Sequence, residues 1–435
     1  MTMNKLSLLT LFLFPFFVSA QEVLNLEDAV SIALKNNYDI QLALNSEKQS
    51  ENNQTIYNSG YLPSVVANGN TNYSNKNTSL TSQQGVETNI DGAVVESYGA
   101  SIGINYILFN GGNRKYQYDK LKEQYKLATS QKRLQIENTL MEVYTLFFNV
   151  ARNQEQKKTL EAAYTISKER LERVIAQQKY GQKTSLEVLN ARVDANNDSI
   201  NLLNANVVLD NSKRNLNFLL GRGINTKYAV NNTVVLDNSL SYIKLKAQLD
   251  SNNVQLQQIA INKSISDYDL KINRTGWVPN LSASAAYGTN GSDNGKVGFF
   301  QSQTSTGLNA GLSLSWNIFD GGATKVRVQN ARINRLNQDI NEEKLRLSLE
   351  NQLVSLWAEY TSQQTINKTE ALNVSISEQN FLRSKEQFNL GQISALDFRQ
   401  AQLNLIRTKL NLLNAKYNAK ITELQLKKFA GVLMK

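Results

Sequence analysis

The sequence contains no cysteine and no histidine, and it has only three prolines in 435 residues. Such a chain offers no thiolate nucleophile, no imidazole base, no disulfide and no cysteine for a lipid anchor. We find no Gly-rich phosphate loop and no compact carboxylate cluster in their place. We therefore predict no enzyme, no catalytic residue, no metal site and no cofactor. The scarcity of proline favours long helices, because an interior proline costs about 3 kcal/mol.

Long apolar runs are also missing, except at the start of the chain. Lys5 precedes an apolar stretch from Leu6 to Val18, and Val18-Ser19-Ala20 has the small residues of a cleavage site. The stretch is shorter than the 18 or more apolar residues that indicate a membrane-spanning helix. We predict a signal peptide over residues 1–20 and an exported mature chain over 21–435.

The net charge of +10 raises the question of a nucleic-acid partner. Lys and Arg are spread along long helical segments among Glu and Asn, whereas a nucleic-acid footprint gathers them in one stripe. The pattern favours solvated helix faces, and we predict no nucleic-acid binding.

The chain contains an internal repeat. Tyr61-Leu62-Pro63 recurs as Trp277-Val278-Pro279 at a spacing of 216 residues, while Gly181-Gln182 recurs as Gly391-Gln392 at a spacing of 210. The six-residue difference falls between Pro63 and Phe109, where a loop can shorten without disturbing its flanks. We predict a first repeat over about 36–221, a linker over about 222–251 and a second repeat over about 252–431.

Each repeat contains a stretch with period two, in which apolar residues alternate with Ser, Gly and Asn. The clearest stretches are 98–108 and 308–318, and weaker ones precede each of them. We predict four strands at about 64–74, 97–109, 280–288 and 306–319, with polar loops at about 75–96 and 288–306. Alternating strands of about ten residues joined by polar loops are typical of a membrane β-barrel. The alternative is one face of a soluble sandwich. Four strands cannot close a barrel, so we expect one shared between subunits.

After each strand pair the pattern becomes helical. Residues 114–179 contain no proline and no glycine, and as a straight helix they would reach about 100 Å. Steps of three and four residues predict a coiled-coil seam near the end of this helix and along the returning helix. The seam positions are Leu160, Tyr164, Ser167, Leu171 and Val174, then Leu186, Leu189, Val193, Asn196, Ile200, Leu203 and Val207. The second repeat keeps the returning seam 210 residues later, with Arg399 as a polar exception.

The turns between these helices carry clear signals. Gly181 and Gly391 stand where a left-handed C-cap is expected. Thr184-x-x-Glu187 and Ser394-x-x-Asp397 predict capping boxes at the start of each returning helix. Capping alone accounts for both acids, so a functional role depends on where the turns point.

Taken together, these features resemble the TolC family of outer-membrane factors over nearly the whole mature chain. The similarity includes the opening segment 24–37, both turns between the long helices, and the two strand–helix junctions. The junction residues are Phe109, Gly111, Gly112, Phe319, Gly321 and Gly322. The resemblance implies a fold that is mainly α with membrane β. It also implies a homotrimer in which each protomer gives four strands to one barrel in outer-membrane lipid, above a helical tunnel in the periplasm.

The resemblance further implies a passive exit duct for efflux or type I secretion. Its tips would meet a periplasmic adaptor (membrane fusion protein) joined to an inner-membrane transporter of the RND, ABC or MFS type. The tip residues are Gly181, Thr184, Ser185, Leu186, Gly391, Ser394 and Leu396. The alternative function is an exported coiled-coil structural or adhesive protein, which would have no need of the alternating strands. The sequence does not indicate the cargo, although the absence of His and the presence of only four Met argue mildly against dedicated soft-metal handling.

For the tunnel entrance, the family pattern points to four positions. An aspartate six residues after the second tip glycine narrows the entrance in the family, and here it is Asp397, with Glu187 as its repeat partner. The position of a second family aspartate is Gln400. The position of a tyrosine that locks the closed entrance in some members is Phe388, which has no hydroxyl to donate.

Overall fold

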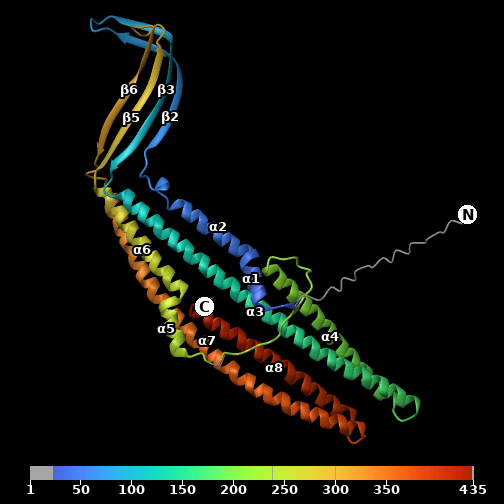
Figure 1. Cartoon of the computed structure of the whole chain (residues 1–435). Coiled ribbons are helices and arrows are strands. Elements are labelled where there is room, and N and C mark those ends of the chain that lie inside the picture. The colour runs from blue at the N-terminus through green and yellow to red at the C-terminus, as the bar shows by residue number, and fades with distance from the viewer. Residues whose placement is uncertain (1–22, 238, 299, 434–435) are drawn as a thin grey trace, which may run out of the picture. The chain divides into compact units, whose positions relative to one another are not determined.

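The computed structural model describes residues 23–237, 239–298 and 300–433, so the predicted signal peptide lies outside the described residues. The chain divides into two compact units. We call the part made of residues 23–41, 136–245 and 353–433 the hairpin unit. The part made of residues 42–135 and 246–352 is the sheet unit. Figure 1 shows the elements coloured along the chain.

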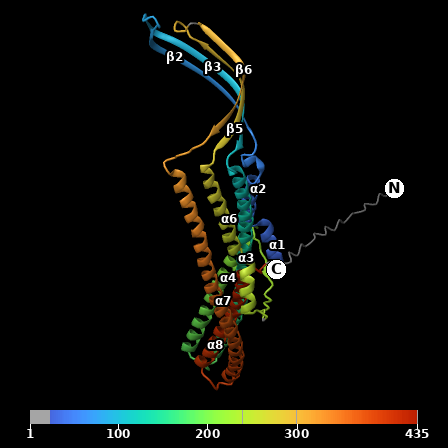
Figure 2. The ribbon, with the colours of Figure 1, turned by 90° about the vertical axis from the view of Figure 1, so that its left-hand side faces the viewer.

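The sheet unit contains one antiparallel sheet of four strands, in the order β2-β3-β5-β6. Its strands are β2 (Ser64–Thr81), β3 (Glu87–Phe109), β5 (Asn280–Asp293) and β6 (Ser302–Ser315). β3 pairs with β5, so the two repeats meet in the middle of the sheet, and Figure 2 shows the four strands side by side in one curved layer. Most side chains on both faces are exposed. The predicted four strands are confirmed.

The limits of the strands differ from the prediction. Most of the two predicted polar loops is strand, and the connections shrink to residues 82–86 and 294–301. At its other end β6 stops at Ser315, so Trp316, Ile318 and Phe319 lie beyond the strand that was predicted to include them. Polar composition did not prevent pairing, because Ser, Thr and Asn side chains can bond across strands, as Thr306 Oγ1 does to Thr289 Oγ1 at 2.9 Å.

Four long helices confirm the helical prediction. They are α3 (Asn113–Lys179), α4 (Ser185–Leu219), α7 (Ala323–Asn389) and α8 (Ala395–Phe429). Adding 210 to the limits of α3 and α4 gives those of α7 and α8. Adding 216 to the limits of α1 (Leu26–Asn36) gives those of α5 (Tyr242–Asn252). The sequence repeat is thus a structural repeat, and most of α5 lies within the range predicted as a linker.

Shorter helices complete the two repeats. They are α2 (Tyr38–Asn53) and η1 (Ile56–Asn58) in the first, and α6 (Val254–Arg274) and η2 (Thr275–Trp277) in the second. Asn253 caps α6, since its Oδ1 accepts from the backbone N–H groups of Gln255 and Leu256. None of the helices within the described residues has both the length and the apolar character needed to cross a membrane.

The hairpin unit has a buried core in which α1, α3, α4 and α8 meet. Phe147, Leu216 and Tyr417 are each at most 2% exposed within this core. Burying one such side chain stabilises the fold by about 1.5–3 kcal/mol. A short parallel pair, β1 (Val23–Leu24) with β4 (Ala229–Val230), lies at its edge and was not predicted.

The predicted seam on the first returning helix is wrong for the single chain. All seven seam positions on α4 are exposed, including Leu186 at 64% and Val207 at 59%. The buried face of α4 contains smaller and more polar residues instead, namely Val188, Ala191, Ala195 and Asp198. The seam on α3 is at least partly buried, and the one on α8 is mixed, because Tyr417 is buried and Leu396 is exposed. Within one chain, α4 therefore presents an apolar row outward.

Candidate functional site at the tips of the helical hairpins

Each pair of long helices in the hairpin unit is joined by the same tight turn. Gly181 lies two residues beyond the end of α3 at φ +71°, and Gly391 lies two residues beyond the end of α7 at φ +74°, a conformation that favours glycine. The Gly181 N–H bonds to Gln178 O at 2.9 Å and the Gln182 N–H to Gln177 O at 3.0 Å, which is a Schellman motif, and the second tip repeats it. The predicted left-handed C-caps are confirmed.

Both predicted capping boxes are present. Thr184 Oγ1 accepts from the Glu187 N–H at 3.3 Å, while Glu187 accepts from the Thr184 N–H at 2.9 Å. Ser394 and Asp397 make the same exchange at the second tip. A further bond from Lys183 Nζ to Glu187, at 2.8 Å, is the main reason why the pKa of Glu187 is lowered, followed by the bond from the Thr184 backbone.

The tips also expose apolar side chains. Leu186 is 64% exposed and Leu396 is 76% exposed, each in the first turn of its returning helix. Ser185 is exposed as well. The structure thus places all seven residues predicted for docking in the two hairpin turns or the first turns that follow them.

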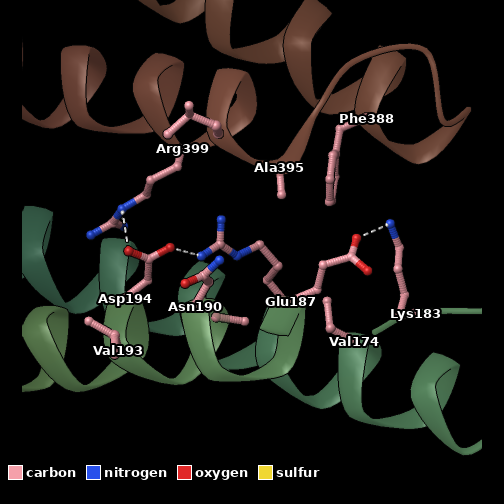
Figure 3. Close-up of a pocket in the computed structure, with 12 residues that line it drawn as sticks. Val174, Lys183, Glu187, Asn190, Val193, Asp194, Phe388, Ala395 and Arg399 are labelled. Atoms are coloured by element: carbon pink, nitrogen blue, oxygen red, sulfur yellow. Dashed lines mark hydrogen bonds and ion pairs between the residues drawn. The ribbon is translucent and has the colours of Figure 1, made fainter. Parts of the chain in front are cut away.

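A cavity of about 340 Å³ lies just behind the tips, between the two hairpins. Figure 3 shows Glu187 and Asp194 of α4 facing Ala395 and Arg399 of α8, with Phe388 of α7 beside them. The cavity has an apolar part, which includes Val174 and Leu396, and a charged part.

Three residues that line the cavity, Arg170, Asp194 and Arg399, belong to a buried ionic network that the sequence analysis did not predict. Arg399 Nη1 and Nη2 donate to the two carboxylate oxygens of Asp198 at 2.7 and 2.8 Å, and the Asp198 side chain is only 4% exposed. Ser167 also donates to Asp198, and Arg170 pairs with Asp194. Four charges from α3, α4 and α8 therefore balance one another inside the protein.

This network changes the interpretation of Arg399. Burial would lower the pKa of its guanidinium, but the hydrogen bonds and the charge of Asp198 outweigh burial and raise it. Arg399 is thus a fixed cation that holds α8 against α4. The spacing of Asp194 and Asp198, four residues apart on one helix face, was the available signal, although the sequence did not show which cation they meet.

The other two predicted entrance residues have local partners. The Phe388 ring stacks on Phe398 with centroids 4.9 Å apart and planes at 11°, so this position contributes packing where a tyrosine would contribute a hydroxyl. Gln400 is exposed, and its amide donates to Asn404 Oδ1 at 3.0 Å.

The strand–helix junctions lie in the sheet unit. Gly111, Gly112, Gly321 and Gly322 all have positive φ, which lets the chain turn from strand into helix. Asp320 accepts from the Thr324 hydroxyl and backbone N–H and from the Gly322 N–H, so its pKa is lowered. Phe109 and Phe319 are 48% and 84% exposed. These residues shape the junction and expose aromatic rings beside it.

In the described part of the chain, no group of three or more Asp and Glu side chains is placed to hold a metal ion. The carboxylates at the tips are engaged in helix caps or ion pairs. What the tips offer is an exposed surface with an apolar and charged cavity behind it.

Comparisons with known proteins agree with this geometry. A family model described as "Outer membrane efflux protein" matches residues 29–222 and 245–432. The fold is similar to the CmeC outer membrane channel of Campylobacter jejuni, with a TM-score of 0.76 and 17% identity over 94% of this chain and 86% of that one. No curated protein matches the chain in sequence.

Two further solved structures have the same fold. A membrane protein from Pseudomonas aeruginosa has a TM-score of 0.77 and 15% identity over 95% of this chain and 92% of that one. The outer membrane protein VceC of Vibrio cholerae has a TM-score of 0.74 and 14% identity, with 93% and 96% covered. The predicted mainly α class is confirmed, and the predicted strands form one small antiparallel sheet.

Proposed function

Because the chain belongs to the outer membrane efflux protein family, as the resemblance predicted, we propose that it is the exit duct of a tripartite efflux or type I secretion system. The family is one of channels, and the chain is not an enzyme. In this proposal three copies share one barrel in the outer membrane, and their helices form a tunnel in the periplasm. Transport through the duct is passive and is driven by an inner-membrane transporter.

The observation that carries the proposal is the open sheet. β2 and β6 are its edges and have no further strand partner among the described residues. Along β6 the exposed apolar residues Leu308, Leu312 and Leu314 share one face. A sheet with an apolar face and two free edges is not tolerated in lipid, because every backbone polar group there needs a partner. Pairing β2 of one copy with β6 of the next would satisfy both edges.

The helices support self-assembly independently. The exposed row on α4 has coiled-coil spacing, which predicts a helix partner that the single chain does not supply. α7 exposes a second row at heptad spacing, formed by Val326, Ile333, Ile340, Leu347 and Val354. In the proposed trimer, helices of neighbouring copies cover these rows.

The tips are proposed to dock the periplasmic adaptor. Exposed Leu186 and Leu396 stand beside the cavity between the hairpins, so a helical hairpin of the adaptor could place apolar side chains there. Replacing Gly391 by leucine would force a side chain into a left-handed turn and should abolish transport while leaving the trimer in the membrane. Normal transport by this variant would show that the tip residues serve folding and do not dock an adaptor.

The absence of cysteine allows a direct test of the shared barrel. One cysteine at Asn70 on β2 would be combined with single cysteines scanned along β6, and oxidation should give covalent dimers and trimers for a subset of β6 positions. The purified protein should also form pores in planar bilayers. A stable monomer with no cross-linked species would refute the shared barrel. Lack of conductance from an intact oligomer would favour the alternative of a surface coiled-coil protein.

A further inference from the structure

The end of the sheet that joins the helices is strongly basic. Four segments link strands to helices there, namely 54–63, 108–118, 270–279 and 316–328. Together they contain six cations and one acid, Asp320, which gives a charge of +5. The cations are Arg114, Lys115, Lys271, Arg274, Lys325 and Arg327. We call this surface the basic junction.

These cations belong to one surface, because η2 lies between the first turns of α3 and α7. Asn113 Nδ2 donates to Thr275 Oγ1 at 2.8 Å, which holds η2 against α3. On its other side η2 approaches α7 so closely that a side chain at Gly276 would meet Thr324 Oγ1 at 2.9 Å. The ends of α3, α6 and α7 are therefore adjacent at the basic junction.

Three of the six cations have no partner within the part of the chain that the structure describes. The side chains of Lys115, Arg274 and Lys325 are exposed and make no ion pair or hydrogen bond there. The others are engaged, as Arg327 is by Thr324 and Asp320. Lys115 and Lys325 also stand in the first turns of their helices, where a cation is unfavourable and where no acid is present. Folding alone does not explain them.

Exposed aromatic rings lie next to these cations. Trp277 is 49% exposed and Trp316 57% exposed, and the indole of Trp316 donates to Trp277 O at 3.1 Å. Tryptophans beside cations are typical of the boundary between hydrocarbon and headgroups. The opposite end of the sheet has the reverse charge, with four acids and one lysine in segments 77–96 and 290–306. The two ends of the sheet thus face different chemical environments.

We propose that the basic junction binds anionic phospholipids, with Lys115, Arg274 and Lys325 contacting headgroup phosphates while Trp277 and Trp316 contact the glycerol and acyl region. This inference rests on the proposed function, since it requires the sheet to lie in a membrane. Free phosphate is not the ligand we infer, because it has nothing to place against the exposed rings. Binding would fix the depth of the sheet in the bilayer.

The test uses the full chain purified in a non-ionic detergent, with native mass spectrometry to count retained lipids. Phosphatidylglycerol is the anionic probe and phosphatidylcholine the zwitterionic one. The test variant is K115Q/R274Q/K325Q. The control variant is K168Q/K344Q/K385Q, which removes three exposed lysines from α3 and α7. The nearest of them to the basic junction is Lys344, about 30 Å along α7 from its first turn.

We expect the wild-type and control proteins to prefer phosphatidylglycerol and the test variant to lose that preference. Each cation near an anionic surface contributes roughly fivefold to binding, so a loss of roughly 100-fold is expected for three. Raising the salt concentration should weaken binding to the wild-type protein. Equal retention by all three proteins would overturn the inference, and so would equal loss in both variants.

Two further measurements separate the possible failures. Displacement of the lipid by the same concentration of inorganic phosphate would show a free-anion site and would overturn the lipid assignment. Pore formation in planar bilayers by wild-type protein that shows no lipid preference would refute this inference while leaving the proposed function intact. A wild-type chain that neither assembles nor conducts would refute the proposed function itself.

Discussion

The buried pair between Asp198 and Arg399 allows a sharp prediction about the stability of the tips. The Asp198 side chain is 4% exposed and the Arg399 side chain 10%, so replacing Arg399 by methionine would leave a nearly dry carboxylate without its bidentate partner. Removing one partner of such a pair typically costs about 3–5 kcal/mol. Ser167 would still donate one hydrogen bond to Asp198, but a hydroxyl does not replace a charge.

The expected loss is local, because the pair joins α8 to α4 near the tips. A cost of about 3–5 kcal/mol corresponds to an increase of roughly 10²-fold to 5 × 10³-fold in local opening. Hydrogen exchange of the backbone amides around Asp198 in α4 and Arg399 in α8 should report it, while exchange near Phe147 in the core should change little. The matched control is Lys409→Met, which breaks an exposed α7–α8 pair with Glu378 and should cost about 1 kcal/mol or less.

A second variant distinguishes charge from packing. Replacing both partners, as Asp198→Leu with Arg399→Met, removes the uncompensated charge, and apolar substitutes for buried pairs are often neutral or stabilising. Exchange at the tips should therefore return close to the wild-type rate in the double variant. Equal exchange at the tips in Arg399→Met and Lys409→Met would refute the reasoning. A double variant that is less protected than Arg399→Met would refute it as well.

Three other predictions concern the tips. Asp397→Ala should reduce cation selectivity in single-channel recording, because three copies of Asp397 would converge on the axis of the proposed trimer. Glu187→Ala is the control and should leave the selectivity unchanged. Equal changes in both variants would show that Asp397 acts only as a helix cap. Thr184→Ala and Ser394→Ala should each cost about 0.5–2 kcal/mol of local stability, read by hydrogen exchange against Thr369→Ala on the exposed face of α7. The pKa of Glu187 is lowered from 4.5 on folding, so the stability that its carboxylate adds is complete above pH 4.5 and is lost as the pH falls through the folded pKa. The protection of amides at the first tip, measured relative to the intrinsic exchange rate at each pH, should therefore fall in acid, and Glu187→Gln should remove this dependence.

The long helices and their turns could be predicted because their signals are local. The absence of proline and glycine between Arg114 and Lys179 leaves nothing to end the helix, and Gly181 then supplies the conformation that a C-cap needs. The capping boxes follow from residues three positions apart. Such features depend on a few neighbouring residues, so a sequence contains all the information that they require.

The strand ends were harder to predict, because alternation fades where both faces meet solvent. In β2 the stretch from Asn75 to Thr81 is polar except for Leu80, and the pairing with β3 continues across a bulge between Lys76 and Thr78. Backbone pairing with β3 determines that these residues form a strand, and their side chains give no period-two signal. At the other end, the alternation runs past Ser315 to Ile318 although the strand has stopped.

Long-range partners were beyond the reach of the sequence. Arg399 looked like an exception in an apolar row, and its partner Asp198 lies 201 residues away on the face of α4 opposite to the one expected to be buried. Periodicity shows which face of a helix is apolar, but it does not show which element packs against that face. Asp198 on the buried face lowers the apolar signal of that face, so periodicity predicts the more hydrophobic row of α4 as the seam.

That error itself contains information about assembly. A row in which Leu189, Val193, Ile200 and Leu203 are each more than half exposed would be a costly surface for an isolated protein, since large contiguous apolar patches mark interfaces. The seam prediction gave the correct spacing for a helix partner but assumed that the partner lay in the same chain. The proposed trimer resolves this conflict, because one interface per copy covers the row that the fold leaves bare. If cysteine cross-linking finds no contact between copies along α4, then some other protein must cover this row.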